Sequence, residues 1–588
     1  MKHFFLFFVF ILIPSVVFAQ KQINIRDYGV TPGEQDATPG LLQALEDCRK
    51  FVGAELIFPQ GEYHFYPDYG IDRYCFISNN DEGLKRIIFP LFNFHGLVIN
   101  GQGSSFIFHG FVNPFVVDNS SDILFDNFSV DYTRTFHSEA IILANHSEGI
   151  DVTIPLEFPY CIRNGVLLFT DGSKEEKPKT TVSKDVIYPY TSLLEFDIRK
   201  RETAFMAKDY FLNNIPLIAQ ELGENKVRIF LNGLKGTVGN IMTFGAGTRN
   251  YPGFVISDSK DVQLKNITIH HTGGMGVVGQ RSHNISLDSC TVSPSEGRII
   301  SCTADATHFT NCTGKIELSH CLFENQKDDA TNIHGIYVRI EKMIGPNEIV
   351  VGLKHNQQFG FDFLKPGVEV ECVKATNLIT KGNVTIVAVQ KINKEYTRVK
   401  LEQHLPEGIG IGDVIGLANG FANVHIHHNV IRNNRARGML LNCRGTTIIE
   451  NNYFHTPGAA IMFEGDASFW YEQGGVRNCI IRNNIFDNCL FGIWGEAVID
   501  VQASILKDRN TSRYNKNIRI EKNTFRIFDN ILLLNIFAVD NFIWANNIIE
   551  RNTDYRALRK RKSLFKIEYS DTVSYTHLRA HETDSYLV

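Results

Sequence analysis

The chain has 588 residues, which is long enough for several domains or for a repeat protein that grows one structural unit at a time. Its formal net charge of −5 at pH 7 provides no basic surface for nucleic acid. The 44 Phe and 20 Tyr predict a core rich in packed aromatic rings. The 11 cysteines show no CxxC pair and no zinc-site spacing, so we expect buried free thiols rather than metal ligands or disulfides.

The first 19 residues have the pattern of a secretory signal peptide. Lys2 supplies the charged start, residues 4–13 form the apolar run, and Val17-Phe18-Ala19 is a small-residue cleavage site. We therefore expect a mature chain that begins at Gln20 in an exported compartment, the bacterial periplasm or the medium. No cysteine follows the expected cut and no later segment is long and apolar enough to span a bilayer, so we expect no membrane anchor.

The last residues, 573–588, read as a sequence artefact. The run from Val573 to Thr583 matches the translation of a common sequencing adapter. We expect this segment to be adapter-derived and exclude it from the prediction of the fold.

A short phrase repeats in the C-terminal part of the chain. Apolar residues alternate, an Asn marks a corner, and an apolar pair starts the next strand; the copies lie about 23 to 39 residues apart. Asn tolerates the left-handed backbone of a tight corner and can form a ladder with Asn side chains in neighbouring coils. The pattern predicts an all-β fold, a right-handed parallel β-helix. The five copies are residues 425–431, 448–454, 480–486, 519–525 and 542–549.

The N-terminal part predicts a cap for this coil. A strand at residues 23–30 is followed by a helix at residues 38–51, with apolar side chains at helical spacing up to Phe51, and then by a strand at residues 54–63. A helix at this place would cover the open end of the first coil, which otherwise exposes unpaired strand edges.

Two segments break the repeat, and both predict inserted domains. Within them the Asn corners largely vanish and short alternating strands appear, which favours small antiparallel β-barrels that wall a site between them. The predicted organisation is a cap with the first coils (20–131), a first barrel (132–248), central coils (249–335), a second barrel (336–417) and C-terminal coils (418–572).

Three aspartates are the candidate catalytic residues. Asp305 lies about one coil before the adjacent pair Asp328 and Asp329, and stacked strands are only about 4.8 Å apart. Paired carboxylates suit the cleavage of glycosidic bonds, which needs a proton donor and a base. The sequence leaves the inverting and the retaining separations open. Neighbours in a regular strand point to opposite faces, so we expect the chain to bend or bulge at Asp328 and Asp329.

Polar and aromatic residues around these aspartates are candidate sugar ligands. His308, Asn332 and His334 are interleaved with the aspartates, whereas Arg444 and Tyr471 are weaker candidates. His270 and His271 are expected to pack in a turn rather than to bind metal. The residues predicted to bind substrate are Arg298, His308, Asn332, His334, Arg437, Glu464 and Trp470.

With these motifs the chain resembles family 110 of the glycoside hydrolases, the bacterial exo-acting α-1,3-galactosidases of the Bacteroides type. The resemblance implies an inverting hydrolase that needs no metal or other cofactor and removes terminal α-1,3-linked galactose from blood-group-B-type or linear Galα1-3Gal glycans. It implies catalytic roles for Asp305, as the general acid, and for Asp328 and Asp329, as the pair that activates water. The implied partners are α-galactosylated glycans of the mucin or blood-group type.

Two alternatives remain open from the sequence. A polygalacturonase-like hydrolase shares the fold and an Asp-Asp pair, but it normally needs a basic groove, and no basic cluster is evident near Asp305 or Asp329. A glycan-binding β-helix without activity would tolerate loss of the aspartates, whereas an enzyme would lose turnover. The oligomeric state is left open between a monomer and a homodimer.

Overall fold

The computed structural model describes residues 21–80, 83–172, 186–559, 563–576 and 579–580. The predicted signal peptide, residues 1–19, lies outside the described residues. Part of the adapter-like tail is described, and its strand β52 continues the sheet by pairing with β49 in parallel register. Within the described part the structure contains no helix long and apolar enough to cross a membrane.

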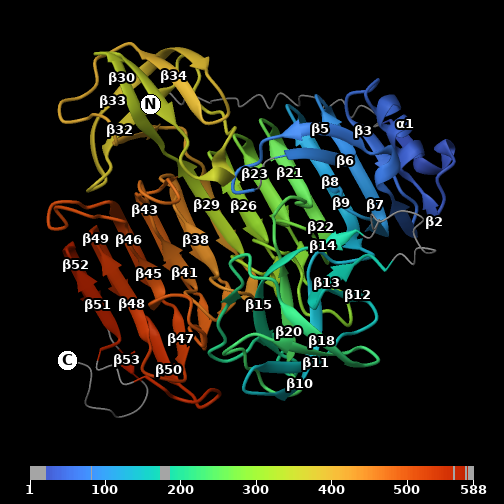
Figure 1. Ribbon diagram of the computed structural model, residues 1–588. Coiled ribbons are helices and arrows are strands. Elements are labelled where there is room, and N and C mark those ends of the chain that lie inside the picture. Colours follow the sequence, from blue (N-terminus) through green and yellow to red (C-terminus); the bar gives the residue numbers. More distant parts are fainter. Residues whose placement is uncertain (1–20, 81–82, 173–185, 560–562, 577–578, 581–588) are drawn as a thin grey trace, which may run out of the picture.

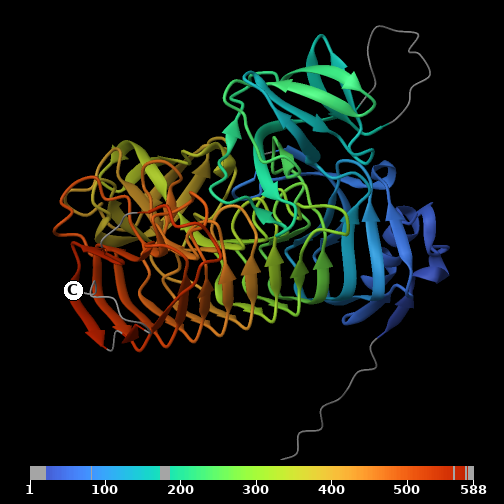
Figure 2. The same cartoon turned by 90° about the horizontal axis from the view of Figure 1, so that it is seen from below.

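The main body is a stack of β coils, which confirms the predicted parallel β-helix. Figures 1 and 2 show its strands lying side by side in chain order, from the blue N-terminal end to the red C-terminal end. Two large sheets form the coils, and apolar side chains from both point into one continuous core.

The strands of the first sheet are β1 (Gln22–Asn24), β2 (Gly33–Asp36), β3 (Ala54–Ile57), β4 (Glu62–Phe65), β7 (His95–Phe108), β9 (Ser121–Tyr132), β22 (Lys260–Ile269), β24 (His283–Asp288), β25 (Thr291–Val292), β27 (Thr313–Ser319), β28 (Leu322–Glu324), β36 (Asn423–His427), β37 (Val430–Arg432), β39 (Thr446–Glu450), β40 (Tyr453–His455), β43 (Asn478–Arg482), β44 (Ile485–Asp487), β46 (Asn515–Glu521), β47 (Thr524–Ile527), β49 (Val539–Ala545), β50 (Ile548–Arg551), β52 (Asp571–Thr576) and β53 (Arg579–Ala580). The strands of the second sheet are β5 (Ile71–Cys75), β6 (Gly83–Phe92), β8 (Asn113–Asp118), β21 (Phe254–Ser257), β23 (Val277–Gln280), β26 (Thr307–Thr310), β29 (Thr331–Ile336), β38 (Met439–Leu441), β41 (Ile461–Phe463), β42 (Glu472–Gln473), β45 (Ala497–Val501), β48 (Leu532–Phe537) and β51 (Phe565–Glu568).

The N-terminal helix α1 (Thr38–Cys48) packs on the first coil, as the sequence predicted. Leu41, Leu45 and Cys48 are buried in the main core. The helix ends earlier than expected, and Phe51 lies beyond it with 43% of its surface exposed. The short 3₁₀ helices are η1 (Ile25–Tyr28), η2 (Pro67–Tyr69) and η3 (Asn356–Gln358).

Buried asparagines form a ladder at one corner of the C-terminal coils. The Asn452 side-chain amide donates to Oδ1 of Asn484 at 3.0 Å, and Asn429 donates to Oδ1 of Asn452 in the same way. The ladder continues to Asn523 and Asn547. The left-handed backbone falls on the residue before each ladder Asn, including the non-Asn residues His428 and Lys522. The two tasks that we expected of one Asn are therefore divided between neighbouring positions.

Two insertions interrupt the coils. The first insertion is an antiparallel sheet with its own core, entered after β9 and left before β21. It contains β10 (Ser138–Asn145), β11 (Gly149–Thr153), β12 (Tyr160–Arg163), β13 (Val166–Thr170), β14 (Ile187–Tyr188), β15 (Tyr190–Asp197), β16 (Glu202–Thr203), β17 (Tyr210–Phe211), β18 (Ile218–Gly223), β19 (Lys226–Phe230) and β20 (Ile241–Ala246).

The second insertion is a closed antiparallel barrel between β29 and β36. Its strands are β30 (Val338–Gly345), β31 (Glu348–Gly352), β32 (Glu369–Lys374), β33 (Ile379–Lys391), β34 (Tyr396–Leu401) and β35 (Val414–Leu417). In Figure 1 the two insertions, teal-green and yellow, lie on either side of the coils that carry β26, β29 and β38.

The 11 cysteines are all free thiols, and most are buried in the coils. This agrees with the expectation that they act as small apolar residues rather than as bridges.

Candidate active site

A pocket of about 460 Å³ opens where the central coils meet both insertions. Thr191, Ser192 and Phe211 of the first insertion form part of its wall, and Gln357 in η3 of the second insertion lies at another part. The predicted catalytic aspartates line its floor. The site is therefore built from three parts of the chain that are far apart in sequence.

Strand register stacks the key side chains. Thr307, Thr331 and Met439 are paired across β26, β29 and β38. Asp305, Asp329 and Arg437 each precede these residues by two positions, so they occupy equivalent places in successive coils. The backbone follows the same stack, since the Ala306 amide donates to the Asp329 carbonyl at 2.9 Å.

Of the two expected possibilities, a bend or a bulge, the chain shows a bend at the adjacent pair. Asp328 and Asp329 lie in the turn between β28 and β29, where consecutive side chains need not alternate between faces. One carboxylate oxygen from each of Asp305, Asp328 and Asp329 lies within 4.8 Å of the others. The relative solvent exposure of Asp305 is 2% and that of Asp329 is 1%, so these carboxyl groups are almost fully shielded from water.

Three arginines compensate this cluster. Arg437 holds Asp329 through two hydrogen bonds, at 2.9 Å to Oδ1 and 3.0 Å to Oδ2. Arg249 donates to Asp328 Oδ2 at 2.7 Å, and Arg435 lies 3.3 Å from Asp328 Oδ1. The expectation that no basic cluster lies near the aspartates is thus wrong. The positive charges come from segments distant in sequence and are brought in by the fold.

The three aspartates differ in acidity because the arginines offset the effect of burial to different extents. Burial acts to raise the pKa of Asp328, but Arg435, Arg249 and Arg437 hold that pKa below its usual range. Burial, and then the charge of Asp328, raise the pKa of Asp305 to about 7. Burial also raises the pKa of Asp329, yet its paired bonds with Arg437 favour the ionised form. Three coupled carboxyl groups titrate together, and we place their shared proton on Asp305.

Hydrogen-bond direction, together with the burial that keeps both imidazole rings neutral, gives the same assignment. His334 Nδ1 lies 2.7 Å from the Gly335 carbonyl, which only accepts, so Nδ1 carries a proton. Burial lowers the pKa of His334 and lowers that of His308 to about 4, so both rings are neutral. Nε2 of His334 must then accept from Nε2 of His308, 3.0 Å away. Nδ1 of His308 is left as an acceptor 2.6 Å from Asp305 Oδ2, so the proton between them belongs to Asp305.

Several predicted sugar ligands do line the pocket. Asn332, Arg437, Glu464 and Trp470 are at its surface. The buried Asn332 Oδ1 has no hydrogen-bond partner within the described residues, which leaves it available to a hydroxyl group. Asp466 shapes the loop that presents Trp470, since its carboxylate accepts hydrogen bonds from the backbone amides of residues 468–471.

Other predicted ligands are placed elsewhere. His308 and His334 lie behind Asp305 as its hydrogen-bonding chain, not at the pocket surface. Arg298 pairs with Asp131 at 2.8 Å and does not line the pocket, so an internal ion pair replaces the expected sugar contact.

The weaker candidates are also remote from the pocket surface. Arg444 pairs with Glu371 at 2.6 Å, and Tyr471 is buried in a core cluster shared with the second insertion. His271 is fully buried and accepts from the Phe136 amide, as expected of a packed turn residue.

Sequence reasoning missed some residues of the site. Arg249, Arg435, Lys327, Asp209 and Glu472 line the pocket, and all of them except Lys327 lie outside any local motif. Only Lys327 had a usable signal, since it directly precedes the Asp pair.

A pocket in which three aspartates of differing acidity meet, set on a parallel β-helix, is the arrangement expected of a glycoside hydrolase. Comparisons with known proteins agree. A family model described as GLAA-B beta-barrel domain I matches residues 138–242, and GLAA-B beta-barrel domain II matches residues 348–415.

Alpha-1,3-galactosidase A of Shewanella woodyi is 36% identical over 97% of this chain and 94% of its own length. Alpha-1,3-galactosidase B of Phocaeicola vulgatus is 32% identical over 97% of both chains. The chain belongs to the alpha-1,3-galactosidase A/B family. Among solved structures, the A-module of the Azotobacter vinelandii mannuronan C-5 epimerase AlgE4 aligns with a TM-score of 0.41 at 9% identity, over 94% of this chain and 100% of that one.

Proposed function

We propose that this protein is an exo-acting hydrolase that removes terminal, non-reducing α-1,3-linked galactose from blood group B and linear Galα1-3Gal glycans by single displacement. The observation that carries the proposal is the cluster of Asp305, bonded to His308, with two arginine-held carboxylates in one pocket. The relatives, which bear the name alpha-1,3-galactosidase, support the choice of sugar and linkage.

Each aspartate has a separate task in this proposal. Asp305 gives its proton to the oxygen of the leaving sugar, while Asp328, ionised by its arginine neighbours, accepts a proton from the attacking water. Asp329 is the second carboxylate of the pair that activates this water. The short separation of the carboxylate oxygens would, taken alone, favour a double displacement. However, both oxygens of Asp328 and of Asp329 face guanidinium groups, which makes each carboxylate a poor nucleophile but leaves it able to orient water.

The pocket suits the end of a neutral glycan. The two insertions wall it, which favours a chain terminus over the middle of a polymer. Trp470 offers an aromatic face to a sugar ring, and the buried Asn332 Oδ1 and Thr303 Oγ1 have no hydrogen-bond partners in the described part of the chain. Such atoms gain most when a substrate hydroxyl pairs with them.

The charge of the pocket disfavours the polygalacturonase-like alternative. Seven acidic side chains line it against four basic ones, and three of these four are arginines bonded to aspartates. A polyanionic substrate would meet net repulsion there.

The test is to incubate the purified protein with blood group B trisaccharide and with Galα1-3Gal and to follow proton NMR from the first minutes. We expect β-galactose before mutarotation; α-galactose first would show a double displacement instead. Asp305→Asn should lower kcat by about 10²- to 10⁴-fold, whereas Asp288→Asn, on the outer face of β24, should not. Binding of both sugars without any release of galactose would leave the glycan-binding alternative.

We also propose that the protein is exported to the periplasm or the medium. The sequence pattern of residues 1–19 supports this. Mass spectrometry of the protein recovered from cell fractions checks it, with a mature N-terminus at Gln20 in the exported fraction as the expected result and an intact Met1 as the contrary one.

A further inference from the structure

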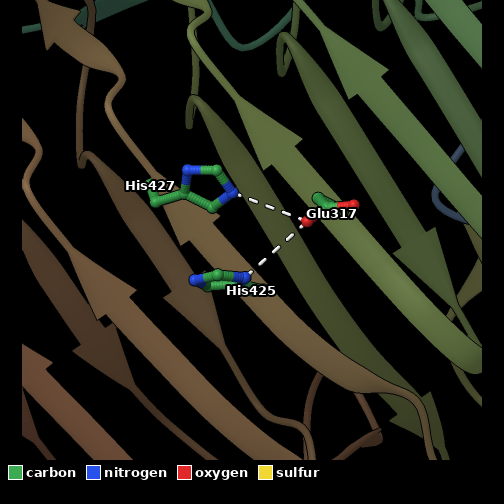
Figure 3. Close-up of side chains that lie close together, drawn as sticks. All are labelled: Glu317, His425 and His427. Carbon is green, nitrogen blue, oxygen red and sulfur yellow. Dashed lines mark ion pairs between the residues drawn. The ribbon is translucent and has the colours of Figure 1, made fainter.

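Two histidines and a glutamate converge on the outer face of the first sheet, away from the pocket. Glu317 lies on β27, and His425 and His427 lie on the neighbouring strand β36. These three side chains are partly exposed and alternate with core residues such as Ile316 and Ile426. Figure 3 shows both imidazole rings turned toward the same carboxylate.

The distances fit a coordination shell better than hydrogen bonds. Glu317 Oε1 lies 3.7 Å from His425 Nδ1 and 3.5 Å from His427 Nε2. Both separations exceed the roughly 2.7–3.2 Å of an N–H···O bond. The His427 separation falls within the edge of about 3.3–3.6 Å between adjacent ligands of a tetrahedral Zn²⁺ with bonds of about 2.0–2.2 Å, and the His425 separation is only slightly longer.

The other ring nitrogens already have the partners that metal-binding histidines need. His425 Nε2 lies 3.0 Å from Glu450 Oε1, and His427 Nδ1 lies 3.0 Å from Nδ1 of His428. When His425 donates to Glu450, its Nδ1 lone pair faces Glu317. When His427 donates to His428, its Nε2 lone pair does the same. Such outer partners orient the ligands and fix their tautomers.

We propose that Glu317, His425 and His427 form a binding site for a divalent transition metal of the Zn²⁺ class, with solvent water as the fourth ligand. Two imidazoles and one carboxylate are the donor set that such ions prefer. In the structure the Lys315 ammonium lies 2.7 Å from the same Glu317 oxygen. Lys315 is half exposed, so it can swing away when a metal replaces its charge.

The position of the site indicates what the metal would do. Strands β27 and β36 are neighbours in the stack, but the chain between them passes through the whole second insertion. A metal shared by the two strands would fasten the coil at the point where it is interrupted. Metal binding of this kind stabilises the folded chain. The inference is independent of the galactosidase proposal, because none of its ligands lines the pocket.

Isothermal titration of the chelator-treated protein with ZnCl₂ tests the site. We expect one equivalent to bind and the melting temperature to rise. Glu317→Gln and His427→Ala should each weaken binding by more than about 100-fold, since even outer partners contribute about 10- to 100-fold. His404→Ala, an exposed histidine of the second insertion, is the matched control and should bind as the parent does.

A second variant distinguishes loss of the metal ligands from misfolding, because it is expected to strengthen binding. Lys315→Met removes the competing ammonium and should tighten Zn²⁺ binding. Asp305→Asn should bind Zn²⁺ unchanged, which separates this site from the aspartate cluster. The proposal is overturned by the absence of stoichiometric binding, by binding that survives His427→Ala, or by binding that Lys315→Met leaves unchanged.

Discussion

We assign the shared proton to Asp305 because the direction of hydrogen bonds behind it agrees with the raised pKa that burial and the charge of Asp328 give its carboxyl group. The Gly335 carbonyl can only accept a hydrogen bond, so His334 Nδ1 donates to it. His308 Nε2 then donates to His334 Nε2, and the carboxyl group of Asp305 donates to His308 Nδ1. Burial of both rings keeps them neutral, so the chain cannot reverse by taking up a proton. His308 is therefore a positioning residue that keeps the acid protonated in the resting enzyme.

The pH profile of kcat should show this relation. Asp305 must be protonated to act, and its pKa is raised to about 7, so activity should fall as the pH rises through about 7. Asp328 must be ionised, and its lowered pKa places the acidic limb below the usual range of aspartate, about 3.9. His308→Ala removes the acceptor of the Asp305 proton and admits water, and both changes lower the pKa of Asp305. The basic limb of the profile should therefore move to lower pH.

His308→Gln provides the matched control, because its amide oxygen can still accept the Asp305 proton. We expect this variant to restore the basic limb toward its original position. A basic limb that stays in place in His308→Ala, with only kcat reduced, would show that His308 has a purely structural role.

At the scale of elements, the asparagine ladder ties successive coils together. Asn452 links three coils, since it accepts from the Asn429 backbone and side chain and donates to Asn484 and to the Ile426 carbonyl. All of these groups are buried, so each bond that is lost leaves a polar group without water.

Asn452→Ala should therefore lower the free energy of unfolding by about 2 to 4 kcal/mol, because each unsatisfied buried group costs about 1–3 kcal/mol. Urea unfolding of the coils, followed by the fluorescence of the buried Trp544 in a Trp470→Phe, Trp494→Phe background, measures the change. Asn478→Ala is the control: this Asn is exposed and makes one surface hydrogen bond, so we expect a change below about 0.5 kcal/mol. Equal changes in the free energy of unfolding for the two substitutions would show that the ladder has no special role in stability.

The same elements show what a sequence can reveal and what it cannot. The Asn corners and the spacing from Asp305 to Asp329 are periodic and local, so the coil and the aspartate cluster were predictable. Arg249 and Arg435 reach Asp328 across 79 and 107 residues of chain, and no local pattern encodes such contacts. Side-chain placement was the other gap: His308 and Asn332 pair in register on β26 and β29, yet Asn332 lines the pocket whereas His308 lies behind Asp305.

At the scale of the whole molecule, three separate cores share one chain. One continuous core runs through the coils, and each insertion has its own smaller core. The cores touch through limited contacts, such as the cluster in which Leu194 and Phe196 of the first insertion meet Ile299 and Ile300 of the central coils. Small cores bury less apolar surface per residue, so the insertions should be less stable than the stack of coils.

Unfolding in urea should therefore not be two-state. Trp544 is buried in a C-terminal coil, whereas Trp470 packs against His355 of the second insertion and Trp494 donates to Asp209 of the first. In a Trp470→Phe, Trp494→Phe variant the fluorescence of Trp544 therefore reports on the coils, whereas far-UV circular dichroism reports on every strand. We expect the dichroism to begin changing at lower urea than the fluorescence, because the insertions open first. Release of galactose should decline with the dichroism, since Thr191, Phe211 and Gln357 of the insertions wall the pocket. If both signals and the activity follow one curve, the insertions and the coils form a single cooperative unit, and the contacts around Leu194 and Ile299 couple them more strongly than their separate cores suggest.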